Sequence, residues 1–265
     1  MQQSIDVFPG RAALVVAHPG HELRVHHWME RARPVVFVLT DGSGSIHSSR
    51  LASTTAVLER AGARPGSIYG RLSDRDLYRA LLDHDYNLFE SLVCELVREL
   101  DAHGIDTVAG DAVEGFNPGH DTCRLLLNAA VERLAALRGL APANLEFPLD
   151  GAPDDAGASP DSLRLTLDDV ALARKLEAAR GYPEMADELE RAVSRYGTAA
   201  FRVEHLRPVS YGLAIAGRAS RPPFYEVYGE RKVAEGVYRE VIRLREHLEP
   251  LAAALTAEGL RESAA

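Results

Sequence analysis

The stretch Ala12-Ala13-Leu14-Val15-Val16-Ala17-His18-Pro19-Gly20-His21-Glu22 decides the fold. Its first six residues are a continuous apolar run, which stops at Pro-Gly and gives way to a helical pattern over 22–32. This order predicts a buried strand, a tight turn and a helix. Because α/β folds place reactive groups at the carboxyl ends of their strands, two histidines three residues apart in this turn can share one metal ion.

The same motif recurs about a hundred residues later. An apolar run over 105–109 predicts another strand, and Asn117-Pro118-Gly119-His120-Asp121 stands between it and a helical pattern over 121–137. A four-residue echo can arise by chance. Both copies, however, carry a potential ligand at the same structural position, and we therefore expect His18, His21 and His120 to converge on one site.

The whole chain alternates strand and helix patterns. This alternation predicts an α/β fold with a Rossmann-like, doubly wound, mostly parallel sheet, helices on both faces and a helical C-terminal extension. The predicted strands are 11–17, 34–39, 67–69, 105–109, an edge strand at 145–149 and a later strand at 201–206; the predicted helices are 22–32, 49–63, 85–102, 121–137, 168–180, 183–196 and 231–255. We expect one domain over 1–265, with a core at about 11–150, an exposed loop over 150–160 and a mostly helical part at about 165–258. The prolines of 220–225 predict a connector.

Composition excludes several classes of protein. A net charge of −9 and a pI near 5.6 argue against binding to nucleic acid through bulk electrostatics. No apolar run is long enough for a membrane span, and the N-terminus lacks the pattern of a secretory signal, so we expect a cytoplasmic protein. The turns that follow the predicted strands lack the glycine-rich sequence motif that binds dinucleotide cofactors. Two cysteines, Cys94 and Cys123, are too few for a disulfide framework, and we expect both to be small buried apolar residues. Cys123 is also a less favoured candidate for a metal ligand.

These motifs resemble the PIG-L/LmbE family of zinc-dependent N-deacetylases. The resemblance rests on Ala17-His18-Pro19-x-x-Glu22, a Gly-rich loop after Thr40, Arg50 at the next helix and Asn117-Pro118-Gly119-His120. It covers roughly 11–137, and 165–250 more loosely. It implies one Zn²⁺ per chain, with His18 and His120 at the positions of zinc-binding histidines and His21 at that of a zinc-binding aspartate.

The chain departs from the family at the positions that move protons. Gly20 falls where the family has its general base, Asn117 where it has a histidine, and Gly119 where it has an aspartate. Losing a general base typically costs about 10²–10⁴-fold in rate.

Candidate replacements for the base are Glu22, Asp41, Glu114 and Asp121. Each also has a structural interpretation, in a first helical turn or in its own loop turn. We expect Glu22, then Glu114, to protonate the leaving amine. We expect Asp41 and Glu114 to line the pocket.

Two functions follow. The first is hydrolysis of an N-acylated amine. The family resemblance implies that this substrate is an N-acetylated sugar or sugar conjugate. We expect Asn117, Arg50 and Tyr225 to contact it. Tyr225 has packing as its alternative role. The second is a degenerate homologue that binds metal or ligand without deacetylase activity. The sequence leaves open the substrate, a homo-oligomeric state and the choice between zinc and iron.

Overall fold

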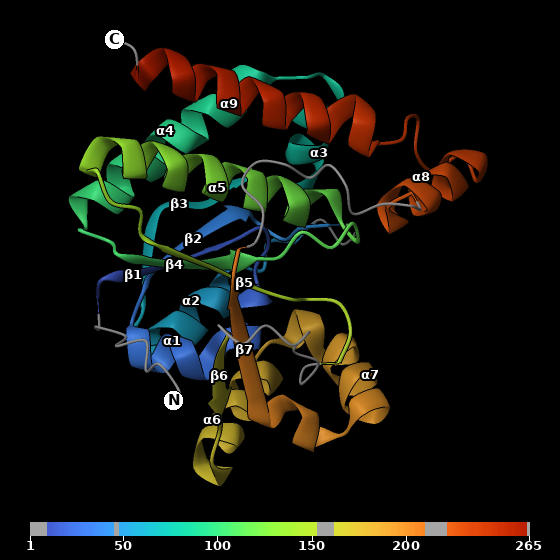
Figure 1. The fold of residues 1–265 in the computed structure, drawn as a ribbon. Coiled ribbons are helices and arrows are strands. Elements are labelled where there is room, and N and C mark those ends of the chain that lie inside the picture. The colour runs from blue at the N-terminus through green and yellow to red at the C-terminus, as the bar shows by residue number, and fades with distance from the viewer. Residues whose placement is uncertain (1–9, 45–47, 153–161, 210–221, 264–265) are drawn as a thin grey trace.

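A central sheet organises the structure, a computed structural model that describes residues 10–44, 48–152, 162–209 and 222–263 (Figure 1). Seven strands in this part follow the order β3-β2-β1-β4-β5-β7-β6. The strands are β1 (Ala12–Val16), β2 (Val35–Thr40), β3 (Arg64–Leu72), β4 (Thr107–Asp111), β5 (Ala143–Phe147), β6 (Leu163–Thr166) and β7 (Val203–Pro208). The helices are α1 (His26–Ala32), α2 (Leu51–Ala61), α3 (Asp74–Leu82), α4 (Tyr86–Ala102), α5 (Pro118–Arg138), α6 (Asp169–Arg180), α7 (Ala186–Tyr196), α8 (Phe224–Ala234) and α9 (Glu249–Ser263). Short helical turns lie at His21–Val25, Pro183–Met185, Thr198–Arg202 and Leu244–Leu248.

The first five strands are parallel, as the continuous apolar runs predict. β1 pairs with β2 on one side, Ala13 opposite Val35, and with β4 on the other, Ala13 opposite Val108. β7 then pairs antiparallel with both β5 and β6. The prediction that 145–149 is an edge strand was therefore wrong, because β7 covers the free side of β5.

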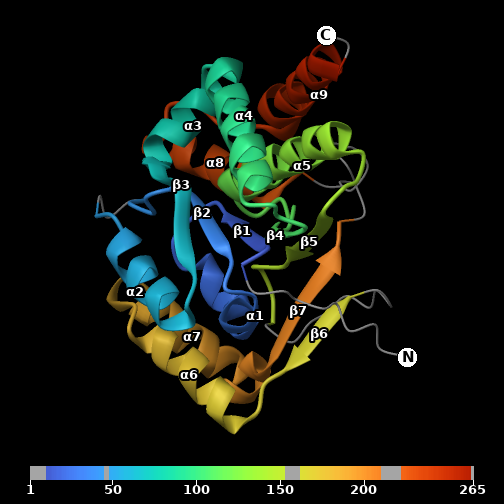
Figure 2. The same cartoon turned by 90° about the vertical axis from the view of Figure 1, so that its left-hand side faces the viewer.

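Helices cover both faces of the sheet. Figure 2 shows α4, α5 and α9 on one face and α1, α2 and α6 on the other. Alternate residues of β1 enter separate cores: Ala13 and Val15 pack beneath α4 and α5, and Leu14 and Val16 beneath α1 and α2. This arrangement confirms the predicted doubly wound fold. Among the described residues, no helix is both long and apolar enough to cross a membrane.

Several boundaries differ from the predictions. The predicted helix 22–32 is split into a 3-10 turn and α1, and the predicted helix 231–255 is interrupted after α8, where Gly236 adopts φ 72° and the chain resumes helical turns only at Leu244. β3 is longer than the predicted strand 67–69. The sequence patterns missed β6 and also α3, which a capping box between Ser73 and Asp76 begins.

The C-terminal part is mostly helical, and it supplies β6 in addition to β7, the strand that the pattern over 201–206 predicted. Pro222 and Pro223 precede α8, as the connector prediction required there, whereas residues 210–221 and most of the predicted loop 150–160 lie outside the described residues. Cys123 is buried in the core between α5 and the sheet.

The strand order reverses direction between β1 and β4. From β1 the chain winds outward to β2 and β3, then returns to place β4 on the opposite side of β1. The segments that leave the ends of β1 and β4 thus diverge, which opens a crevice at the carboxyl edge of the sheet. His18, His21 and His120 all follow these two strands.

Candidate metal centre

The turn after β1 places two histidines side by side. Gly20 adopts φ 104°, a left-handed conformation that glycine accepts without steric cost. The carboxylate of Glu22, which is fully buried, accepts a 2.7 Å hydrogen bond from the Gly20 N–H. The turn continues as a single 3-10 helix, His21–Val25, and the ring centroids of His18 and His21 lie 5.3 Å apart.

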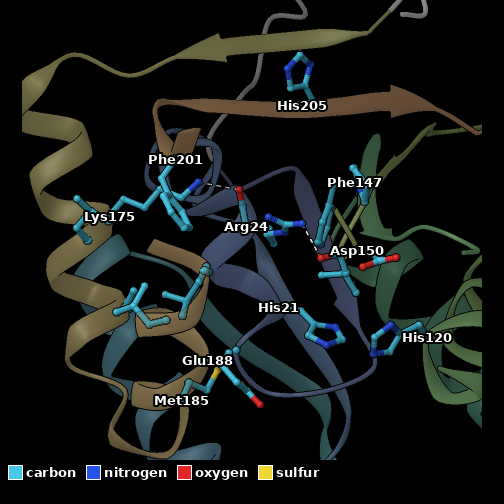
Figure 3. Close-up of a pocket in the computed structure, with 18 of the residues that line it drawn as sticks. His21, Arg24, His120, Phe147, Asp150, Lys175, Met185, Glu188, Phe201 and His205 are labelled. Atoms are coloured by element: carbon cyan, nitrogen blue, oxygen red, sulfur yellow. Dashed lines mark hydrogen bonds between the residues drawn. The ribbon is translucent and has the colours of Figure 1, made fainter. Parts of the chain in front are cut away.

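The third histidine comes from the first turn of α5. Asn117 caps this helix by accepting the Gly119 N–H at 2.7 Å, and Pro118 occupies the first helical position, where a proline costs no hydrogen bond. The ring centroid of His120 lies 5.2 Å from that of His18 and 4.5 Å from that of His21. Figure 3 shows the His21 and His120 rings next to each other. The structure thus brings the three imidazoles together.

Two buried carboxylates orient these rings. The Nδ1 of His18 lies 2.9 Å from Asp74 and 2.8 Å from the Thr40 hydroxyl, and the Nδ1 of His21 lies 3.0 Å from both oxygens of Asp111. Burial opposes ionisation of Asp74, but hydrogen bonds from His18, Thr40 and the Gly44 N–H overcome this effect and lower its pKa to about 2. A carboxylate at Nδ1 leaves Nε2 as the lone-pair donor, as in metal sites with carboxylate-bound histidines.

Sequence reasoning missed both carboxylates. Asp111 is the last residue of β4, two positions beyond the predicted end of that strand, and it also accepts the N–H of Ala17, the residue that follows β1, at 2.8 Å. The strand-end position of Asp111 was a usable signal. Asp74 begins α3, the helix that the patterns did not predict, so only the fold brings it to His18.

The donor set fits a metal ion. His18 Nε2 and His120 Nδ1 are buried and have no hydrogen-bond partner among the described residues. Burial, reinforced by the two neighbouring imidazoles, lowers the pKa of His120 well below its usual value, which keeps the ring in its neutral, ligating form. With Zn–N bonds of about 2.1 Å, tetrahedral directions space imidazole centroids by about 5 Å. The three observed separations are of this size.

In this structure the three histidine side chains do not yet converge on one point at metal-binding distances. Across residues 10–44, 48–152, 162–209 and 222–263, no group of three or more histidine, cysteine, aspartate or glutamate side chains is gathered closely enough to hold an ion as it stands. The side chains would have to turn to aim all three rings at one point.

The four carboxylates proposed for proton transfer bind backbone N–H groups. Glu22 holds the Gly20 turn, and burial raises its pKa to about 7. Glu114 accepts the N–H groups of residues 149 and 150, and burial raises its pKa as well. Asp41 accepts the Ser43 N–H, and Asp121 accepts the Glu114 N–H. Their catalytic roles stay predictions.

The three residues predicted to contact substrate occupy different parts of the structure. Asn117 accepts from the Tyr78 hydroxyl in addition to Gly119. Arg50 stands at the N-terminus of α2, 3.9 Å from Glu188. Tyr225 is 6 % exposed and belongs to the core on the α5 face, where the packing alternative placed it.

A methionine closes the space next to Gly20. A Cβ atom at Gly20 would lie 2.2 Å from the sulfur of Met185, far inside van der Waals contact. Where the family resemblance expects an aspartate side chain, this chain therefore has both a left-handed backbone and a neighbouring side chain that fills the room. The sequence showed that the base is missing at residue 20, but it did not show that the side chain of Met185 occupies the space next to this residue.

A cavity of about 380 Å³ adjoins two of the three imidazoles. His21 and His120 form part of its wall, and most other lining side chains are apolar, contributed by the turn after β1, the end of β5, α6 and α7 (Figure 3). Among the residues that the structure describes, Glu22, Asp41, Glu114, Arg50, Asn117 and Tyr225 lie outside this lining.

Comparisons with known proteins show similarity in fold. No family model matches the sequence, and no curated protein matches it. Among solved structures, a teicoplanin deacetylase in a zinc-inhibited form is 12% identical with a TM-score of 0.50, over 75% of this chain and 99% of that one. The deacetylase of the antimicrobial A40926 pseudoaglycone is 17% identical with a TM-score of 0.49, over 78% of this chain and 100% of that one. At these identities the chain shares the fold of the teicoplanin deacetylase.

Proposed function

We propose that this protein is a metal-dependent hydrolase that removes an acyl group from an N-acylated amine, with one Zn²⁺ per chain bound by His18, His21 and His120. The observation that carries the proposal is the cluster of three imidazoles, two of them held at Nδ1 by the buried carboxylates Asp74 and Asp111. The fold shared with a deacetylase, and the resemblance of the sequence motifs to zinc-dependent N-deacetylases, support the same activity.

The protein's own residues would prepare the site in two ways. The carboxylates of Asp74 and Asp111 fix the two rings and make their Nε2 atoms better donors. The low pKa of His120 removes competition from a proton. A divalent ion in this position supplies Lewis acidity to the amide carbonyl and to water.

Glu22 is our first choice for the proton donor to the leaving amine, followed by Glu114, and Asp41 is a candidate for the missing general base. Glu22 follows His21 directly and its carboxyl lies within the same turn. Glu22→Gln keeps an oxygen for the Gly20 N–H but removes the ionisable proton. If Glu22 transfers a proton, this variant should lose about 10²–10⁴-fold in kcat/KM while retaining its metal. A purely structural Glu22 would tolerate the change.

The second candidate function is binding without hydrolysis. It is favoured by Gly20, which stands where the family resemblance expects the base and whose missing side chain leaves space that Met185 fills, and by the backbone hydrogen bonds that occupy Glu22, Glu114 and Asp41. In this case the histidine cluster would bind a metal or a ligand that the chain does not turn over.

Metal content and amine release separate these functions. We expect purified protein loaded with zinc to retain one ion per chain by elemental analysis, and His18→Ala, His21→Ala and His120→Ala each to lose it. His103→Ala, a change at a histidine remote from the cluster in sequence and fold, is the control and should retain the metal.

Amine release from N-acylated sugars is then measured across roughly pH 6–9, where zinc-bound water ionises. Release that disappears in the three histidine variants supports the hydrolase. Stoichiometric metal without release supports the binding protein, and a chain that retains no metal overturns the proposed centre.

A further inference from the structure

The cavity beside the histidine cluster is much larger than an acetyl group. An acetyl group has two carbons and one oxygen. At about 30 Å³ for each group the size of a water molecule, a cavity of 380 Å³ has room for about a dozen carbon or oxygen atoms. An acetyl amide held at the cluster would leave most of this volume empty.

Helix α7 presents an apolar stripe to this cavity. Met185, immediately before the helix, and Leu189 and Ala192 within it follow helical spacing and all line the cavity. None of the 11 residues of α7 is buried, although amphipathic helices normally bury their apolar face against the core. Leu176 and Ala179 of α6 line the same space.

Three charged side chains along the cavity, Lys175, Arg24 and Glu188, are paired with other groups, Glu188 with Arg50 at 3.9 Å. The ammonium of Lys175 lies 2.9 Å from Glu204 and 2.9 Å from the Arg24 carbonyl, so its methylene stem is what borders the cavity. The guanidinium of Arg24 donates to the carbonyls of Leu149 and Gly151. Asp150 is on the exposed side of the lining. A sugar placed against the apolar part of this lining, which the side chains of α6 and α7 form, would leave its hydroxyls unpaired, which is unfavourable, whereas a hydrocarbon chain would not.

We infer that the cavity binds the hydrocarbon chain of the acyl group, and that the substrates are amides of medium-chain fatty acids. This inference rests on the proposed function. The cavity begins at His21 and His120, so a carbonyl held at the cluster directs its chain into the space between α6 and α7. Of the two halves of a glycoconjugate amide, only the acyl half can be hydrocarbon throughout; the amine half carries hydroxyl groups and remains outside.

The first test is a chain-length series. Glucosamine acylated with acetyl, butyryl, hexanoyl, octanoyl and decanoyl groups is offered to the zinc-loaded protein, and amine release is measured. Each methylene moved into an apolar site is worth about fourfold, so we expect kcat/KM for the octanoyl amide to exceed that for the acetyl amide by at least about 100-fold. N-acetyl-octylamine carries its chain on the other side of the amide and should show no such gain. Equal rates for all chain lengths, or a preference for N-acetyl-octylamine, would overturn the inference.

The second test fills the cavity. Ala192→Trp should lower the octanoyl-to-acetyl ratio of kcat/KM by at least about tenfold, because the indole occupies the volume that methylenes would fill. Leu189→Gln, which adds no bulk but makes the stripe polar, should lower the ratio in the same direction. The matched control is Ala186→Trp, the same change at an exposed position of the same helix, which should leave the ratio as in the wild type. A ratio that neither Ala192→Trp nor Leu189→Gln lowers would count against the cavity as the chain site.

Calorimetry with sodium octanoate separates this inference from the proposed function. Octanoate bound by the wild type and the Ala186→Trp variant, but not by Ala192→Trp, supports the chain site even if no amide is hydrolysed, in which case only the hydrolase proposal fails. Hydrolysis of acetyl amides without octanoate binding leaves the hydrolase intact and overturns the chain site.

Discussion

At the scale of single residues, Gly20 and Met185 act as a pair. A left-handed glycine lets the turn between His18 and His21 stay tight, and its missing side chain leaves the room that the Met185 thioether fills. Any side chain at residue 20 meets both a steric overlap and an unfavourable φ angle. A carboxylate at residue 20 therefore requires both a strained backbone and a displaced Met185 side chain.

The pair makes a direct prediction. Gly20→Asp alone should destabilise the fold by about 1–3 kcal/mol, from the clash with Met185 and the left-handed backbone. Combined with Met185→Ala, it should recover part of this loss, because the overlap is relieved while the φ strain remains. Thermal melts of both variants and of Met185→Ala alone measure the coupling. A single Gly20→Asp variant as stable as the wild type would refute it.

At the scale of elements, α5 connects the histidine cluster to the sheet. Its first turn carries His120, and one turn later the fully buried Arg124 donates to the carbonyls of Asp111 and Leu145, at the ends of β4 and in β5. Gly110 makes this approach possible, since a Cβ there would lie 3.0 Å from the Arg124 guanidinium and 2.4 Å from the Val15 carbonyl. The position of Asp111 beside His21 therefore depends on α5.

Arg124→Met should reveal this connection. It leaves buried carbonyl oxygens without donors, and we expect a loss of about 2–4 kcal/mol in the free energy of unfolding together with weaker zinc retention. Denaturant melts and elemental analysis give the two readouts, with Arg31→Met, at an exposed position, as the control. Unchanged stability would mean that water or a neighbour replaces the guanidinium.

At the scale of the whole molecule, an ion pair links the helices α4, α5 and α9, which cover one face of the sheet. Arg133 of α5 binds Glu90 of α4 through both guanidinium nitrogens and donates to the Leu255 carbonyl of α9. The hydrogen bond from Arg133 outweighs desolvation and lowers the pKa of Glu90. A carboxyl whose pKa is lower in the folded state stabilises the fold above its unfolded pKa of about 4.3, and this contribution is lost as the pH falls through the folded value.

We therefore expect Glu90→Gln to lower the melting temperature near pH 7 and to have less effect below about pH 4, where the wild-type carboxyl is itself protonated. The effect should be small, at most about 1 kcal/mol, because the pair is partly exposed. Melting temperatures of the two proteins from pH 7 to pH 3 measure the difference. A difference that does not shrink in acid would assign the effect to packing.

Much of this architecture follows from local pattern. The apolar run Ala12–Val16 pairs with two other apolar strands, as a strand buried on both faces must, and the Pro-Gly-His turns lie at the edge where parallel strands end. The strand 145–149 was misplaced as an edge because its antiparallel neighbour, β7, lies some 60 residues later and no local signal announces the pairing. The break between α8 and α9 was missed because helical spacing continues across it.

The sequence by itself predicted the parallel strands of the sheet and placed the turns that carry His18, His21 and His120 at the carboxyl ends of two of them, because strand periodicity and turn residues act within a few positions. Only the tertiary structure decided what surrounds the imidazoles. Asp74, Asp111 and Met185 reach the cluster from elements separated by up to about 165 residues, and burial, which sets the pKa of Glu22 and His120, exists only once those elements pack. The cavity between α6 and α7 is likewise a property of packing, because helical spacing predicts an apolar stripe but not whether the core will cover it.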